Sequence, residues 1–356
     1  MDPWRTNNFD LVRLLAASQV AAVHGLTWFG VASNVQPLMY LLRPFPGVPI
    51  FFFISGMLVS RAYLRTSTRD YLRNRCLRIL PALWISIVFG LTLVFAVPEC
   101  STPSTFLDWM GWWAAQMSLA QNWDFAFERC GRTLSVGRWT IAVELTFYLL
   151  LPLLMFLLRK SGRLAELLLV VLMIVSLLFQ HWFLDLMPAG GGAPVLAFFQ
   201  ESLVSYLWIF CLGVLAHRRF EAVRSWFEGK LHWWLVAYAV ATLIAFKSGL
   251  VVGGNDINPL SMLVLAGLVL SLGHTVPSLA GRLLQGHDFS YGLYLFHMPL
   301  MILISLAGVP AGWSAFVLWL CLAACFAALS WFVVERRFLR RKHSSSHAMD
   351  VSAAPG

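Results

Sequence analysis

The sequence predicts an all-α polytopic membrane protein with about ten transmembrane helices and both termini in the cytoplasm. Three observations support this prediction. Apolar residues make up 59% of the 356 residues and charged residues only 12%, whereas about 25% is usual in soluble domains. The chain also divides into apolar runs that are long enough to cross a bilayer. Its basic residues gather in alternate connections between those runs.

The apolar runs are candidate spans because a bilayer-crossing helix needs about 17–25 mostly apolar residues. The first run contains Arg13, Gln19 and His24 and shows no clear cleavage site, so we interpret it as a retained span. No polar segment could house a second soluble domain, so we expect one transmembrane domain over 1–342 and a disordered cytoplasmic tail over 343–356. The expected spans are 9–29, 46–63, 79–97, 139–158, 164–184, 198–216, 232–248, 259–276, 289–307 and 314–334.

The basic residues give the expected orientation. Of the 26 Lys and Arg residues, 20 fall in one set of connections and terminal segments, five fall in the other set, and Arg13 lies inside a span. The positive-inside rule places the richer set in the cytoplasm. The net charge of +9 therefore reflects topology, and no nucleic-acid-binding motif accompanies it. We expect a multi-pass protein of a bacterial inner (plasma) membrane that contacts the lipid bilayer and no nucleic acid.

The first span, 9–29, carries two ionisable side chains on one face. Arg13 and His24 are eleven residues apart, which is three helical turns plus about 20°, and about 16 Å along the axis. An ionisable side chain inside a span is costly unless it faces protein or water, so both residues are candidates for a functional site. The alternative is hydrogen bonding to a neighbouring helix. The orientation places Arg13 near the cytoplasmic face and His24 nearer the outside.

Basic and small residues next to this helix could complete a site. Arg75 and Arg78 precede the third span with i, i+3 spacing, so both could face one pocket at the membrane surface. Guanidinium groups suit phosphate and pyrophosphate, such as those of coenzyme A. Ser55 and Gly56 in the second span could line a cavity beside the first helix, although a helix-packing pair is the simpler interpretation.

Two further spans contribute buried polar side chains. Glu144 lies about 8 Å inside the outer boundary of its span, where it could orient the imidazole of His24 or accept a proton. The alternative is a buried ion pair with an arginine such as Arg138. Tyr291, Tyr294 and His297 recur every three residues, so they form a polar stripe that can bond across helices and line a substrate cavity. For His297, a satisfied structural histidine is the alternative.

The six cysteines indicate a disulfide more than a metal site. Cys100 and Cys130 are the two that we place outside the membrane, where they could form a disulfide. Cys321 and Cys325 are spaced i, i+4 inside a span and are interpreted as small packing residues. We expect no metal site and no permanently bound cofactor.

Six segments in order resemble the integral-membrane acyltransferase-3 family, and the similarity covers essentially the whole chain. They are FDLVRLLAASQVAAVHG, FFFISGMLVS, RNRCLRILP, WTIAVELTFYLLLP, SYGLYLFHMPL and ERRFLRRK. The resemblance implies transfer of an acyl group, usually acetyl from cytosolic acetyl-CoA, to a hydroxyl of a glycan or other acceptor at the outer face. It also implies the stand-alone type, without an appended extracytoplasmic hydrolase-like domain.

The resemblance extends to particular residues. Arg13 and His24 match the family's first-helix pair, with His24 essential for transfer. Arg75 and Arg78 match its basic pair, and the remaining motif positions match Ser55, Gly56 and Glu144. One departure concerns the segment that begins at Glu144. Family members often read EEQFY there, whereas this chain reads ELTFY, so a second acid is missing and any role that needs two carboxylates is in doubt.

The expected mechanism places acyl-CoA on the cytosolic side, with its phosphates on Arg75 and Arg78 and its pantetheine arm beside Arg13. His24, neutral in apolar surroundings, would act as general base toward an acceptor hydroxyl, and Glu144 would fix its tautomer or take up the proton. A covalent acyl-histidine relay stays open. Two rival functions are a transporter or flippase that uses the buried charges as a path, and a catalytically silent sensor.

The sequence leaves several properties open. The acceptor is expected to be a glycan or glycolipid, with peptidoglycan and small secreted metabolites as further candidates. Acetyl is the expected acyl group, and succinyl is an alternative. The sequence says nothing of the oligomeric state.

Overall fold

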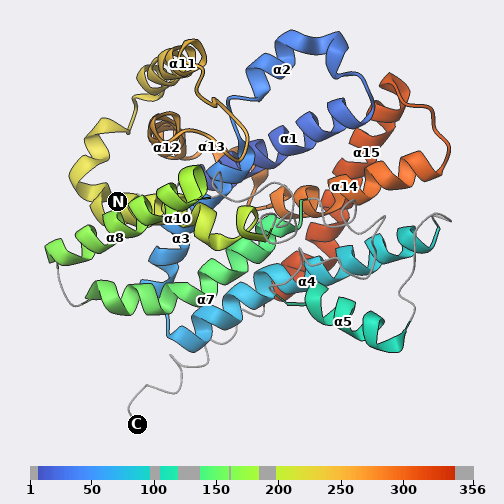
Figure 1. Ribbon diagram of the computed structural model, residues 1–356, viewed down its shortest axis with the longest axis horizontal. Coiled ribbons are helices and arrows are strands. Elements are labelled where there is room, and N and C mark those ends of the chain that lie inside the picture. Colours follow the sequence, from blue (N-terminus) through green and yellow to red (C-terminus); the bar gives the residue numbers. More distant parts are fainter. Residues whose placement is uncertain (1–6, 97–104, 119–136, 160–161, 184–197, 341–356) are drawn as a thin grey trace.

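The computed structural model describes residues 7–96, 105–118, 137–159, 162–183 and 198–340. The described residues form helices and no strand, and the helices pack side by side (Figure 1). The elements are α1 (Phe9–Trp28), η1 (Ala32–Val35), α2 (Gln36–Leu42), α3 (Gly47–Leu64), α4 (Thr68–Phe95), α5 (Phe106–Gln116), α7 (Trp139–Arg159), α8 (Gly162–Leu178), η2 (Phe179–Phe183), α10 (Leu203–Val223), η4 (Arg224–Trp226), α11 (Leu231–Lys247), α12 (Pro259–His274), α13 (Leu279–Leu284), α14 (Ser290–Leu306), α15 (Trp313–Leu329) and η5 (Ser330–Glu335).

The described helices confirm that this is an all-helical chain with membrane-spanning character. Seven of them are long and apolar enough to cross a membrane, and three shorter apolar helices are α11, α12 and α14. Together they fall on the ten expected spans. Since the three short helices have at most 17 residues, the count of ten and the cytoplasmic location of the termini stay predictions.

Apolar side chains cover the outer surface of the bundle as well as its core. On α8, Leu167, Ile174 and Leu178 are each at least half exposed. A helix that is apolar on all sides belongs inside a large protein or a membrane. The outward leucines therefore indicate contact with lipid.

The boundaries of one helix differ clearly from the sequence prediction. α4 begins at Thr68 instead of residue 79, so the basic link is helical and continuous with the span. Ser67 caps this helix: its hydroxyl accepts from the backbone N–H of Asp70 at 3.1 Å and donates to the Asp70 carboxylate at 2.7 Å. This Ser-x-x-Asp arrangement is a helix-start signal. Arg75 and Arg78 consequently lie on a rigid helix instead of a loop.

The core is built around close contacts at glycine. A Cβ added to Gly56 of α3 would lie 2.2 Å from the carbonyl oxygen of Phe210, and one added to Gly213 of α10 would lie 2.2 Å from that of Phe53. Only glycine permits this approach, which makes α3 and α10 the most closely joined pair of helices. The packing interpretation of Gly56 is confirmed.

α1 occupies the middle of the bundle and packs chiefly on α14 and α3. α7 packs on α8, α10, α3 and α4 (Figure 1). The pair α11 and α12 lies at the edge. The predicted disulfide between Cys100 and Cys130, and the predicted disordered tail over 343–356, lie outside the described residues.

Candidate active site

A group of buried charges joins the start of α1 to three other elements. The guanidinium of Arg78 donates to the carboxylates of Asp288 and, at 3.3 Å, Glu335. Arg13 lies 3.7 Å from the same Asp288 carboxylate. Two cations and two carboxylates thus meet, and the side chains of the pairs are at most 20% exposed. The two carboxylates neutralise the charge of Arg78. Buried charges are tolerated when they are paired in this way.

Asp288 holds this group together from the loop before α14. Burial raises the pKa of its carboxyl, but the charges of Arg78 and Arg13 and two hydrogen bonds from Ser290 lower it further, so the pKa lies below the ordinary 3.8. Asp288 is therefore ionised at neutral pH.

The two arginines of α4 face different surroundings. The guanidinium of Arg78 lies 5.8 Å from the ring centroid of Tyr291, inside the group of buried charges. The guanidinium of Arg75 lies 5.7 Å from the ring centroid of Tyr148. Its Nε is buried without a hydrogen-bond partner. Of the two, only Arg78 lines the cavity between α1, α3, α4, α7 and α14, and a shared pocket for both arginines at the membrane surface stays a prediction.

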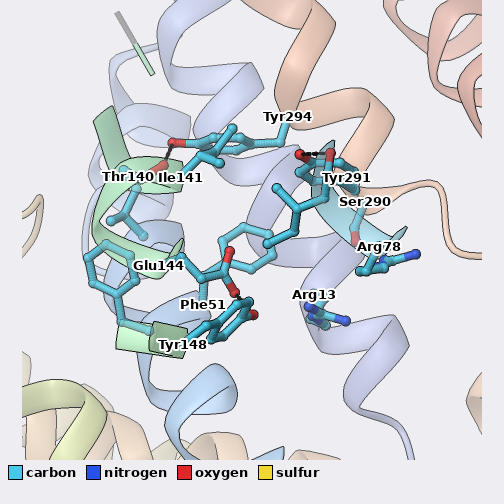
Figure 2. A pocket seen from close by; sticks show the side chains of 13 residues that line it. Arg13, Phe51, Arg78, Thr140, Ile141, Glu144, Tyr148, Ser290, Tyr291 and Tyr294 are labelled. Atoms are coloured by element: carbon cyan, nitrogen blue, oxygen red, sulfur yellow. Dashed lines mark hydrogen bonds between the residues drawn. The ribbon is translucent and has the colours of Figure 1, made fainter. Parts of the chain in front are cut away.

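A narrow cavity runs between α1, α3, α4, α7 and α14. Its free volume is about 40 Å³, enough for a few water molecules. Figure 2 shows Arg13 and Arg78 on one side of it and Thr140 and Glu144 on the other. The remaining lining residues are Val48, Phe51, Phe52, Ile79, Ile141, Tyr148, Ser290, Tyr291 and Tyr294. The cavity is mostly apolar, and the two arginines at one end are paired with the carboxylates of Asp288 and Glu335.

Glu144 is held in this cavity by two hydroxyls. The hydroxyl of Ser55 on α3 donates to the Glu144 carboxylate at 2.5 Å, and the hydroxyl of Tyr148, on α7 with Glu144, also donates to it. One turn earlier, the hydroxyls of Thr140 and Tyr294 lie 2.7 Å apart (Figure 2). Ser55 is therefore placed beside the cavity through Glu144, while Tyr291 and Tyr294 line it as the sequence predicts.

The expected contact between Glu144 and His24 is not formed. No hydrogen bond or ion pair joins these two described side chains. The two side chains have different partners: Glu144 lies with Ser55 beside the cavity that Arg13 also lines, whereas His24 lies eleven residues farther along α1. The partner of His24 is instead His297, whose Nε2 lies 3.1 Å from Nδ1 of His24. The i, i+3 stripe of α14 was the sequence signal for this pair.

The histidine pair has a defined tautomer. Nδ1 of His297 lies 2.6 Å from the carbonyl oxygen of Tyr294, and since a carbonyl can only accept, Nδ1 carries the hydrogen. No carboxylate among the described residues bonds to either ring, so we assign both rings as neutral. Nε2 of His297 then accepts from Nδ1–H of His24. This leaves a lone pair on Nε2 of His24, the form that a general base requires.

Packing fixes the pair in place. The two rings stack with centroids 5.3 Å apart and an interplanar angle of 18°. The indole of Trp319 donates to the carbonyl of His297 at 2.9 Å. A Cβ added to Gly25 would lie only 2.5 Å from the ring of Trp319, so the indole packs directly on the backbone of α1. His297 is 1% exposed, whereas His24 is only partly buried. The accessible ring is therefore His24, held by a buried one.

Comparison with known proteins identifies the family. A family model described as an acyltransferase domain matches residues 6–335. The chain belongs to the acyltransferase-3 family. This acyltransferase is 34% identical to "Nodulation protein 10" of Rhizobium leguminosarum bv. viciae, over 95% of this chain and 94% of that protein. It is 25% identical to "O-acetyl transferase" of Shigella phage Sf6, over 95% of this chain and 97% of that protein. No solved structure shows a significant match to the chain.

Proposed function

We propose that this acyltransferase moves an acyl group, acetyl in the first place, from cytosolic acyl-CoA to a hydroxyl of an extracytoplasmic or exported glycan. The observation that carries the proposal is the contact of 3.1 Å between Nδ1 of His24 and Nε2 of His297. It leaves Nε2 of His24 as an accessible, unprotonated nitrogen. A relative named as an O-acetyl transferase supports acetyl as the group and oxygen as its acceptor.

The donor would enter from the side of the buried charges. Arg75 is the first candidate for the phosphates, because no carboxylate of the described residues forms an ion pair with it, and Arg78 and Arg13 follow along the cavity. At helical rise, Arg13 and His24 are about 16 Å apart along α1. A pantetheine arm of comparable length would bring the thioester to the imidazole. The cavity is narrow, so the helices that line it would have to separate for entry.

The chemical step conserves protons at each stage. Nε2 of His24 takes the proton of the acceptor hydroxyl as its oxygen attacks the thioester carbonyl. The C–S bond then breaks, an ester forms, and the thiolate of coenzyme A takes the proton back from the imidazolium. His297 acts as a positioning residue that fixes the tautomer. Glu144 would contribute as a second polar group in the cavity through Ser55 and Tyr148. An acyl-histidine relay would use the same lone pair as the nucleophile.

The test uses purified protein in lipid nanodiscs with acyl-labelled acetyl-CoA and a glycan extract. Release of free thiol and label on the glycan are measured for the wild type, His24→Ala and the control His232→Ala, an exposed histidine on α11. We expect both activities in the wild type and the control, and neither in His24→Ala, with equal amounts of folded protein. Retained transfer by His24→Ala would refute the mechanism. Movement of a labelled glycan across a membrane without release of thiol would indicate a transporter.

A further inference from the structure

A second cavity, of about 420 Å³, lies apart from the one between the arginines and Glu144. Its volume is within the range of about 300–1,000 Å³ that is usual for small-molecule sites. It is formed where α7 and α10 begin, at η2, and in the connection between α11 and α12. Its lining residues include Trp139, Gln180, Glu201, Tyr206, Asn255 and Asp256. The charge asymmetry of the connections predicts that this end is extracytoplasmic.

The cavity combines aromatic rings with amide and carboxylate groups. The rings of Trp139 and Tyr206 pack with centroids 5.3 Å apart. Gln180 is only 7% exposed. Its amide N–H donates toward the Asp256 carboxylate at 3.4 Å, and its oxygen accepts from the Trp208 indole at 2.7 Å. The buried amide is thus fixed before any ligand binds.

We infer that this cavity binds a sugar unit of the acceptor, and that the sugar is neutral or cationic. The inference rests on the proposed function. Hydroxyl groups can both donate to carboxylates and accept from amides, and the apolar face of a pyranose can pack on an aromatic ring. Among the described residues that line the cavity, two are carboxylates, Glu201 and Asp256, one is a histidine, His181, and none is Lys or Arg. A sugar carboxylate would therefore meet like charge.

The first turn of α7 connects this cavity to the histidine pair. Trp139 lines the second cavity, and Thr140 lines the first and bonds to Tyr294. A Cβ at Gly137 would lie 3.6 Å from Cε1 of His297. Phe52, which lines the first cavity, packs on Trp139 with ring centroids 6.4 Å apart. A sugar in the second cavity would thus lie beside the helix turn that contacts His297.

The test reverses the charge of one cavity residue and measures whether the preference between charged sugars changes. The probes are three tetrasaccharides: cellotetraose, the glucosamine tetramer and tetragalacturonate. Their binding to the full chain in nanodiscs is measured by saturation-transfer NMR without acyl-CoA, for the wild type and Asp256→Lys. The control is Glu221→Lys, an exposed carboxylate on α10. We expect the wild type to bind tetragalacturonate at least tenfold more weakly than the other two. Asp256→Lys leaves one carboxylate, Glu201, and one cation, so it should abolish most of the preference between the charged probes.

A second measurement separates this inference from the proposed function. If Asp256→Lys changes the KM of the acceptor sugars about tenfold but leaves the KM of acetyl-CoA unchanged, the cavity is an acceptor site. If the probes bind with the expected preference but acetyl-CoA is never turned over, the sugar site stands and the proposed function fails. Equal binding of all three probes, or an unchanged preference in Asp256→Lys, would overturn the inference.

Discussion

His297 fixes which nitrogen of His24 carries the hydrogen, because its Nε2 lies 3.1 Å from Nδ1 of His24 and its own Nδ1 donates to the carbonyl of Tyr294. The sequence indicated a polar stripe of Tyr291, Tyr294 and His297, and all three bond across helices or to the backbone as that spacing suggests. The sequence could not indicate which polar residue meets His24. That depends on how α1, α7 and α14 are rotated about their axes. The carbonyl of Tyr294, which sets the tautomer, has no sequence signal at all.

Replacing His297 tests this role. His297→Leu removes the acceptor for Nδ1–H of His24, so we expect kcat to fall about a hundredfold or more while the KM of acetyl-CoA changes little. His297→Gln can place its amide oxygen where Nε2 lies, so it should recover a large part of kcat. Steady-state kinetics in nanodiscs provide the measurement. A merely structural role would lower activity and thermal stability together and would not distinguish Gln from Leu.

Substitution of Arg78 should mainly lower the stability of the fold, whereas substitution of Arg75 should mainly weaken the binding of acetyl-CoA. Arg78→Ala leaves the buried Glu335 carboxylate without a cation and Asp288 with only the more distant Arg13, which costs about 3–5 kcal/mol in the free energy of unfolding. Arg75→Ala removes a cation from above Tyr148 and should cost under about 1 kcal/mol. We expect Arg75→Ala to raise the KM of acetyl-CoA about tenfold through a lost phosphate contact. Thermal unfolding and kinetics of both variants check this, and an unaltered KM in Arg75→Ala would exclude it as a phosphate ligand.

At the scale of elements, the contact between α3 and α10 depends on two glycines. Gly56→Ala would press a methyl group into the carbonyl of Phe210, so we expect a loss of about 1–3 kcal/mol in the free energy of unfolding. Gly281→Ala is the matched control, since nothing lies within 4 Å of its added Cβ, and it should be neutral or slightly stabilising. Thermal unfolding in detergent compares them. Equal melting temperatures would show that α3 and α10 can separate without penalty.

Apolar runs predicted the positions of the helices to within a few residues in most cases, because burial in lipid requires a continuous apolar stretch. α4 is the main exception. Its first turns are too basic for a span and follow a local signal, Ser67 and Asp70, that an apolar window does not register. The short helices η1, α2 and α5 were missed for a related reason. They are shorter than a bilayer crossing, and α5 is defined by a capping box between Thr105 and Asp108.

At the scale of the whole molecule, the orientation rests on charge alone and can be tested directly. Single cysteines are introduced at two exposed basic positions, Lys247 and Arg282, in a chain that lacks its six native cysteines. A maleimide that cannot cross membranes should label Lys247→Cys on intact cells and Arg282→Cys only after permeabilisation, because the positive-inside rule places Lys247 outside. The reversed pattern would invert the orientation and would place the second cavity in the cytoplasm.

The two cavities and the histidine pair are three neighbouring places in the molecule, since neither His24 nor His297 lines either of these cavities. Arg13 and Arg78 mark one end of α1, His24 lies toward the other, and the first turn of α7 connects the pair with the second cavity. Such an arrangement allows a donor and an acceptor to approach from opposite faces. We therefore expect acyl transfer to run across the membrane through His24.

Acyl transfer in sealed inside-out vesicles tests whether the acyl group crosses the membrane through His24. The vesicles enclose glycan acceptor, and acyl-labelled acetyl-CoA, which cannot cross the bilayer, is added outside to the face that was cytoplasmic. We predict that label accumulates on the enclosed glycan with wild-type protein and not with His24→Ala, while free coenzyme A appears outside. Label found only on acceptor added outside, or label on the enclosed glycan with His24→Ala, would contradict transfer across the membrane through His24.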